Sequence, residues 1–87
     1  MVLKKVCLII GGGRGMGAAT AHQMYSRGYR LALMSPSESC EKLAIELGGI
    51  AQRGRAENAS DLKSVFDMTM KNYERIDSVL IHVGGPP

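Results

Sequence analysis

A glycine-rich turn, Gly11 to Gly17, separates an apolar run from a helical pattern, and this placement constrains the fold more than any other feature. The run before it, 6–10, contains only apolar residues, which is typical of a parallel strand buried on both faces. Glycines let a backbone turn sharply and lie close to a phosphate. A following helix presents unpaired N–H groups and the positive end of its dipole there. The turn therefore predicts a site for a nucleotide phosphate.

Strands and helices alternate along the chain. We expect strands at about 3–10, 30–34, 50–54 and 79–83, with a helix in each interval between them. Short links between such elements require right-handed crossovers and a parallel sheet covered on both faces. The predicted fold class is α/β, the first half of a Rossmann-type doubly wound sheet (βαβαβαβ, strand order 3-2-1-4). In that order the glycine turn lies at the switch point where ligands bind.

Local signals predict where the helices begin and end. Gly28 is the expected C-cap of the first helix. Ser35 is the expected N-cap of the second, with Pro36 at its first helical position and Glu38 at its third. The predicted apolar faces are Cys40, Leu43, Ala44 and Leu47 in the second helix, and Leu62, Val65, Phe66, Thr69, Met70 and Tyr73 in the third, which Asn58 and Asp61 would cap.

Size and composition limit the classes of function. Eighty-seven residues allow one small domain, and a net charge of +3 suits an anionic ligand. Nucleic acid is not an expected partner, because the chain has no dense basic run with interleaved aromatic residues. The apolar run is too short to cross a membrane. Cys7 and Cys40 lack partners at metal-ligand spacing, so we expect free, buried thiols in a reducing cytoplasm.

The last predicted strand is apolar on both faces and would lie at a bare edge of the sheet. We therefore expect residues 1–87 to be a half-domain, truncated relative to a doubly wound domain. The edge would be covered by the remainder of the domain or by a partner chain.

The glycine pattern alone fits more than one class of protein. Gly13, Gly15 and Ala18 match the dinucleotide form G-x-G-x-x-A, whereas Gly11, Gly13 and Gly15 match a methyltransferase-like G-x-G-x-G. A third spacing, G-x-x-x-G-x-G, matches Gly11, Gly15 and Gly17. A P-loop is excluded because no Lys-Ser/Thr pair follows the glycines. The other alternative is a glycine-rich turn that binds no ligand.

The end of the second strand favours NADP over NAD. NAD and S-adenosylmethionine sites usually place an acid there for the ribose hydroxyls. This chain has Ser35 and Ser37 instead, and hydroxyls without a carboxylate suit a ribose 2′-phosphate. Arg14 in the glycine turn would add a charge-assisted hydrogen bond to that phosphate, and Arg55 after the third strand would add to the positive field around it.

These motifs resemble those of the short-chain dehydrogenase/reductase family along the whole chain. The segment 9–17 resembles the signature T-G-x-x-x-G-[IV]-G, 28–33 fits the family's second strand, and 76–84 fits its I-D-x-L-V-N-N-A-G segment. The resemblance implies a nicotinamide cofactor, alcohol or carbonyl substrates, and a homo-oligomer in the complete protein.

The resemblance also implies roles for individual residues. Met16 matches the position whose backbone N–H meets the pyrophosphate, and Arg14 matches a position that is often basic in NADP-preferring members. Arg55, followed by Ala56, replaces the acid or amide that meets the adenine edge, where it would stack on adenine or pair with the 2′-phosphate. His82 replaces an asparagine beside the cofactor. Gly84 would let the nicotinamide-side ribose approach the fourth strand.

The family's catalytic serine and Tyr-x-x-x-Lys have no counterpart in these residues. Tyr25, Tyr29 and Tyr73 are followed at the fourth position by Tyr29, Leu33 and Asp77. The sequence therefore predicts no catalytic residue and the NADP-binding portion of an oxidoreductase. The alternatives are a non-catalytic dinucleotide-binding regulatory or interaction module and, less favoured without an acid after the second strand, a methyltransferase.

Overall fold

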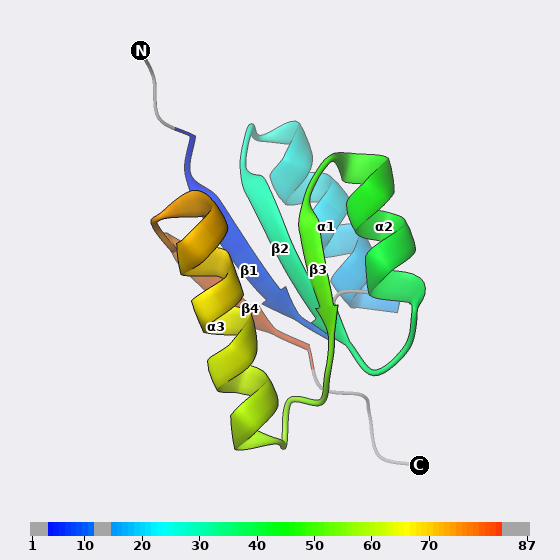
Figure 1. The fold of residues 1–87 in the computed structure, drawn as a ribbon. Helices are drawn as coiled ribbons and strands as arrows, with labels where there is room; N and C mark the ends of the chain where they lie inside the picture. Colours follow the sequence, from blue (N-terminus) through cyan, green and yellow to red (C-terminus); the bar gives the residue numbers. More distant parts are fainter. Residues whose placement is uncertain (1–3, 12–14, 83–87) are drawn as a thin grey trace.

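The computed structural model describes residues 4–11 and 15–82, which alternate between strands and helices (Figure 1). The elements are β1 (Val6–Ile10), α1 (Gly15–Ser26), β2 (Arg30–Ser35), α2 (Ser39–Leu47), β3 (Ile50–Arg53), α3 (Ala59–Tyr73) and β4 (Ser78–Ile81).

The strands form one parallel sheet in the order β3-β2-β1-β4, which confirms the predicted topology. β1 pairs with β2 on one side, Val6 opposite Arg30, and with β4 on the other, Cys7 opposite Ser78. Helices α1 and α2 lie on one face of the sheet and α3 lies on the other (Figure 1). Because strands are parallel, all their carboxyl ends meet at one edge of the sheet.

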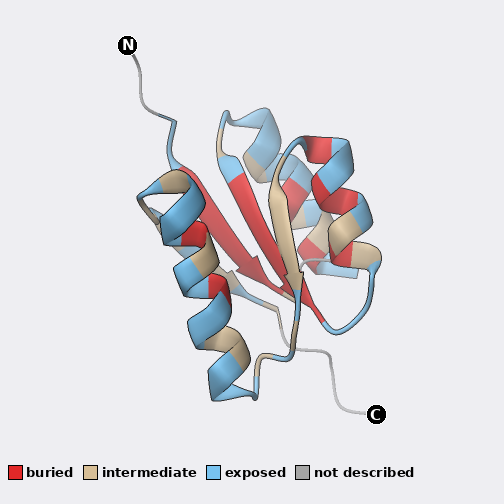
Figure 2. Ribbon diagram, in the orientation of Figure 1, coloured by how far each residue is buried: buried red, intermediate tan, exposed pale blue. Residues whose placement is uncertain are grey.

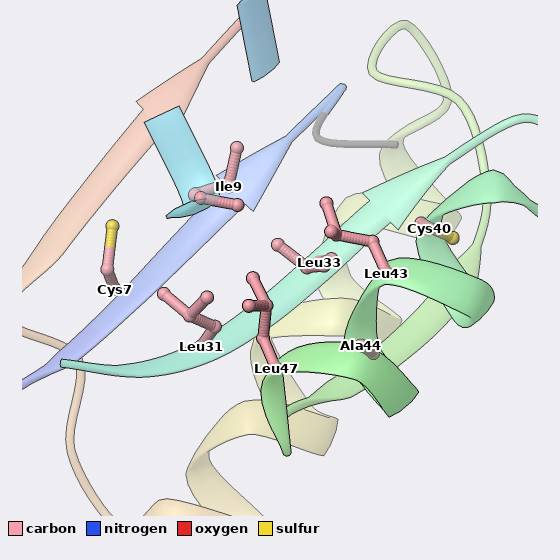
Figure 3. Close-up of a cluster of buried hydrophobic side chains, with 9 residues drawn as sticks. Cys7, Ile9, Leu31, Leu33, Cys40, Leu43, Ala44 and Leu47 are labelled. Atoms are coloured by element: carbon pink, nitrogen blue, oxygen red, sulfur yellow. The ribbon is translucent and has the colours of Figure 1, made fainter. Parts of the chain in front are cut away.

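The two central strands supply a core on each face, and they are the most deeply buried part of the sheet (Figure 2). Alternate residues of β1 and β2 point to opposite faces. One core packs the sheet against α1 and α2 through the predicted stripe of α2 (Figure 3), and its buried residues are Cys7, Ile9, Ala21, Leu31, Leu33, Cys40, Leu43, Ala44 and Leu47. The other packs against α3 and contains Leu8, Ile10, Ala32, Met34 and Val65.

The predicted start of the second helix is wrong. α2 begins at Ser39 with Glu38 as its N-cap, and Ser35 is the last residue of β2. The reason is pairing with the neighbouring strand: Ser35 lies opposite Arg53 of β3, and its carbonyl accepts a hydrogen bond from Gly54 N at 2.9 Å. An N-cap accepts hydrogen bonds from helix N–H groups with its hydroxyl and its carbonyl. The Ser35 carbonyl is used in the sheet and its hydroxyl donates to Ser37 O at 3.0 Å, so neither group caps α2.

The apolar face of α3 is only partly buried. Val65 and Thr69 are buried, but Phe66 is 37% exposed and Met70 is 47% exposed. These two side chains lie on the side of α3 away from Ser64, whose hydroxyl donates to Gln52 on β3. That side faces beyond β4, the outer strand of the sheet among the described residues, where no further described element packs.

At the amino ends of the strands, Asp77 links the start of β4 to the start of β1. Its carboxylate accepts a hydrogen bond from Val6 N at 2.7 Å, and its own N–H donates to Val6 O at 2.9 Å. Arg75 forms a bidentate pair with the same carboxylate, at 2.6 and 2.8 Å. The hydrogen bonds from Arg75 and Val6 lower the pKa of Asp77 below its usual range, because they favour the ionised form.

We expect Gly11→Ala to lower the free energy of unfolding by more than about 2 kcal/mol. Gly11 has φ +86°, and an added Cβ would overlap the carbonyl oxygen of His82. Gly28→Ala is the matched control, since Gly28 has φ +88° but open space around an added Cβ. We expect it to lose only about 1 kcal/mol. Denaturant unfolding followed by circular dichroism measures both, and equal losses would contradict the close contact at Gly11.

Burial raises the pKa of the Cys7 thiol from 9.0 to about 11. Between these pH values the unfolded chain loses the thiol proton while the folded protein keeps it. The free energy of unfolding should therefore fall by about 2 kcal/mol as the pH rises through this interval. In Cys7→Ala the fall should be smaller, leaving the part that comes from Tyr73, whose pKa burial also raises. Urea unfolding at a series of pH values tests this, and identical slopes would overturn it.

Candidate functional site

Three backbone hydrogen bonds tie together the carboxyl ends of the four strands. Gly11 N donates to Met34 O at 2.6 Å, joining the ends of β1 and β2. His82 N donates to Ile10 O at 2.8 Å, joining the ends of β4 and β1. Together with the bond from Gly54 to β2, they place the candidate site residues at one edge, where the strand arrowheads converge (Figure 1).

The glycine turn opens into α1 at this edge. Gly15, with φ +63°, is the first residue of the helix, and Gly17 is buried. Among residues 4–11 and 15–82, an added Cβ at Gly15 would meet nothing within 4 Å, so the backbone is open on that side. Met16 beside it is 78% exposed, so its side chain has no core role. The other predicted residues of this motif, Gly13 and Arg14, lie outside the described residues, as does Gly84.

The two serines after β2 differ in accessibility. Ser35 is 5% exposed, and its hydroxyl donates to Ser37 O at 3.0 Å. Ser37 is exposed, and its Oγ lies 2.8 Å from Ser39 Oγ. The buried Cys40 thiol lies 3.5 Å from Ser37 O and holds this loop against the sheet. Ser37 is therefore the predicted hydroxyl that a ligand can reach directly.

The loop after β3 carries Arg55, and a side chain of α3 holds its backbone in place. Asn58 caps α3 by accepting from Asp61 N at 3.0 Å, as predicted, but the Asp61 carboxylate accepts from Arg55 N at 2.9 Å instead of capping in return. The Arg55 side chain is exposed, and its nearest ionic partner is the equally exposed Glu57 at 3.7 Å. Ala56 is half-buried against the α3 core. The backbone of the loop is held in place while the guanidinium group remains accessible.

His82 follows β4 and contacts α1. Its Nε2 lies 3.3 Å from Thr20 Oγ1, and Thr20 Oγ1 lies 2.9 Å from Met16 O. Sequence reasoning selected His82 but missed Thr20, which looks like an ordinary helix residue. The available signal was spacing, since Thr20 lies one helical turn after Met16 and so on the same face of α1.

A helix that begins at the carboxyl edge of a parallel sheet, with hydroxyl and guanidinium groups after the neighbouring strands, is typical of dinucleotide sites in doubly wound folds. Comparison with known proteins identifies the family. The family model for short chain dehydrogenases matches residues 5–86. The chain therefore belongs to the short-chain dehydrogenase/reductase family.

Curated relatives extend well beyond the matched region. The chain is 40% identical over 86 residues to the 3-oxoacyl-(acyl-carrier-protein) reductase of Rattus norvegicus, covering 95% of this chain and 36% of the relative. It is 32% identical over 85 residues to the 1,6-dihydroxycyclohexa-2,4-diene-1-carboxylate dehydrogenase of Pseudomonas putida, covering 93% of this chain and 32% of the relative. The chain thus spans about a third of the length of these relatives.

Solved structures show the same fold. YwfH, an NADPH dependent reductase involved in bacilysin biosynthesis, matches with a TM-score of 0.86 at 16% identity, over 97% of this chain and 39% of YwfH. A short chain dehydrogenase from Bacillus anthracis matches with a TM-score of 0.78 at 23% identity, over 86% of this chain and 34% of that structure. At these identities the likeness establishes the fold. Within the described ranges, no helix is both long and apolar enough to span a membrane.

We expect Asp61→Ala to loosen the loop that presents Arg55. The variant removes the acceptor for Arg55 N, so exchange of that amide hydrogen should become roughly tenfold faster. Asp61→Asn loses the charge but keeps an oxygen acceptor, and we expect nearly unchanged exchange. Hydrogen exchange followed by NMR measures both variants, and slow exchange in Asp61→Ala would show that the carboxylate does not hold the loop.

Proposed function

We propose that this chain is the NADP-binding portion of a short-chain dehydrogenase/reductase. The observation that carries the proposal is the carboxyl edge of the sheet, where the loops after β2 and β3 expose the Ser37 hydroxyl and the Arg55 guanidinium, while the exposed carboxylates of the same loops, Glu38 and Glu57, pair with Lys42 and Arg55. Gly54 N bonds to Ser35 O at 2.9 Å, so the two loops leave adjacent strand ends. A hydroxyl and a cation suit a ribose 2′-phosphate, whereas NAD would favour a carboxylate there.

The remaining site residues would each contact or shape the site for a different part of the cofactor. Gly11, Gly13, Gly15 and Gly17 would shape the turn, and Met16 N would donate to the pyrophosphate. Arg14 would add a second cation for the 2′-phosphate, and Ser35 would hold Ser37 in place through its hydrogen bond. Ala56 would contact the adenine, while His82 and Gly84 would adjoin the nicotinamide-side ribose. Bound NADP supplies a hydride acceptor or donor for an alcohol or carbonyl substrate.

Several features of the whole protein follow from the proposal. The relatives are about three times as long, so we place the catalytic serine and Tyr-x-x-x-Lys in a further part of the protein. The same part, or a partner chain, would cover β4, where Val79 is 39% and Ile81 is 58% exposed. Two free, buried thiols fit a reducing cytoplasm, and the family implies a homo-oligomer.

Charge reversal at Arg55 tests the cofactor preference. We expect Arg55→Glu to weaken NADPH binding roughly tenfold or more and NADH binding less than about twofold, because only NADPH carries the 2′-phosphate. The matched control is Arg27→Glu, which makes the same charge change after the far end of α1. Isothermal titration calorimetry gives all four affinities.

Two results would contradict the proposal. Equal losses for NADPH and NADH would remove the role of Arg55 in specificity, and S-adenosylmethionine binding without dinucleotide binding would indicate a methyltransferase. The replacement of the family's paired asparagines by Ile81 and His82 favours one other candidate, a non-catalytic dinucleotide-binding module. That candidate predicts NADPH binding without turnover in the protein as its source makes it.

A further inference from the structure

The ring of His82 is joined to the first turn of α1 by two consecutive hydrogen bonds. His82 Nε2 lies 3.3 Å from Thr20 Oγ1, and Thr20 Oγ1 lies 2.9 Å from Met16 O. The backbone of His82 is also fixed, because its N–H donates to Ile10 O at 2.8 Å. A strand end 62 residues further along the chain is thus connected to the helix that follows the glycine turn.

Counting protons gives the direction of both bonds. A carbonyl oxygen only accepts, so the single hydroxyl proton of Thr20 is donated to Met16 O. Thr20 Oγ1 must then accept from His82, which requires a proton on Nε2. Both the neutral Nε2–H tautomer and the imidazolium ion carry that proton. The two hydrogen bonds from His82 to Thr20 and from Thr20 to Met16 O, which we call the relay, therefore keep their direction in both of these forms.

The relay acts on an amide at the helix N-terminus. The Met16 carbonyl belongs to the same planar peptide unit as the N–H of Gly17, so fixing the carbonyl also fixes the direction of that N–H. Gly17 lies in the first turn of α1, which begins at Gly15. The N–H groups of a first turn have no partner within the helix and are available to an anion.

We propose that His82 is a positioning residue for the cofactor pyrophosphate. Through Thr20 and the Met16 carbonyl, it holds the Gly17 N–H in the orientation that the phosphate requires. The proposal rests on the proposed function, because the anion it serves is the pyrophosphate of NADP. Histidine in place of the family's asparagine is then a compensated change, since its longer side chain reaches Thr20.

Side-chain variants separate the relay from simple packing. His82→Gln keeps an N–H donor near the position of Nε2, whereas His82→Met keeps much of the volume without a donor. We expect His82→Met to bind NADPH roughly five- to tenfold more weakly, the effect of one lost hydrogen bond, and His82→Gln to bind within about twofold of the original protein. The control is His22→Met, a change at an exposed histidine of α1 that pairs with Glu46.

The relay also has a signature without cofactor. In the ¹H–¹⁵N spectrum of the free protein, the Gly17 amide signal should move in His82→Met and return toward its original position in His82→Gln. The same comparison can be made at Thr20, where Thr20→Val removes the hydroxyl and Thr20→Ser keeps it. These two variants serve as the test if His82→Met does not fold. Combining His82→Met with Thr20→Val should weaken binding no more than Thr20→Val alone.

The outcomes distinguish failure of the relay from failure of the proposed function. If the original protein binds no NADPH, the proposed function is wrong and this inference falls with it. If the original protein binds NADPH but His82→Met binds equally well, only the relay is overturned. Equal weakening in His82→Met and His82→Gln, with the Gly17 signal displaced in both, would show a packing role and would also overturn it.

Discussion

The close approach of Gly11 to the carbonyl of His82 is the constraint on which the carboxyl edge of the sheet depends. β1 lies between β2 and β4, and beyond its last residue Gly11 bonds to Met34 O while His82 bonds to Ile10 O. A side chain at Gly11 would occupy the space of the His82 carbonyl. The glycine thus lets the end of β4 lie close beside β1, and this close packing brings the His82 ring to Thr20 of α1. Close backbone packing here requires glycine, and the phosphate binding proposed for the same turn would require glycine as well.

The two ends of the sheet are built from different chemistry. At the amino end, the Asp77 carboxylate accepts from Val6 N and pairs with Arg75, so these polar groups already have partners within the fold. At the carboxyl end, the Ser37 hydroxyl is exposed, and the ionic partner of the Arg55 guanidinium among the described residues is the exposed Glu57 at 3.7 Å. Exposed pairs of this kind contribute little to stability. The carboxyl end is therefore the end where a phosphate can replace an existing partner at low cost.

Local patterns in the sequence were sufficient for most of the fold. The alternation of strands and helices with short links predicted the strand order, and the apolar run of β1 and the apolar stripe of α2 predicted buried residues of one of the two cores. The errors and omissions involve partners distant in sequence. Ser35 reads locally as a helix cap, but pairing with Arg53 keeps it in β2. Thr20 carries no local signal for its contact with His82, which only the crossover between α1 and β4 creates.

The uncovered apolar surface and the candidate cofactor site meet on β4. Phe66, Met70, Val79 and Ile81 are exposed along α3 and the outer strand, and Ile81 directly precedes His82. Successive residues of a strand face opposite sides, so Ile81 faces the α3 side while the His82 ring contacts α1 on the other. A segment that packs on Ile81 would restrict the backbone of His82 without touching its ring. Covering this surface would then tighten the contact with Thr20, so the completion of the sheet and the proposed orientation of the Gly17 N–H would be coupled through one short strand.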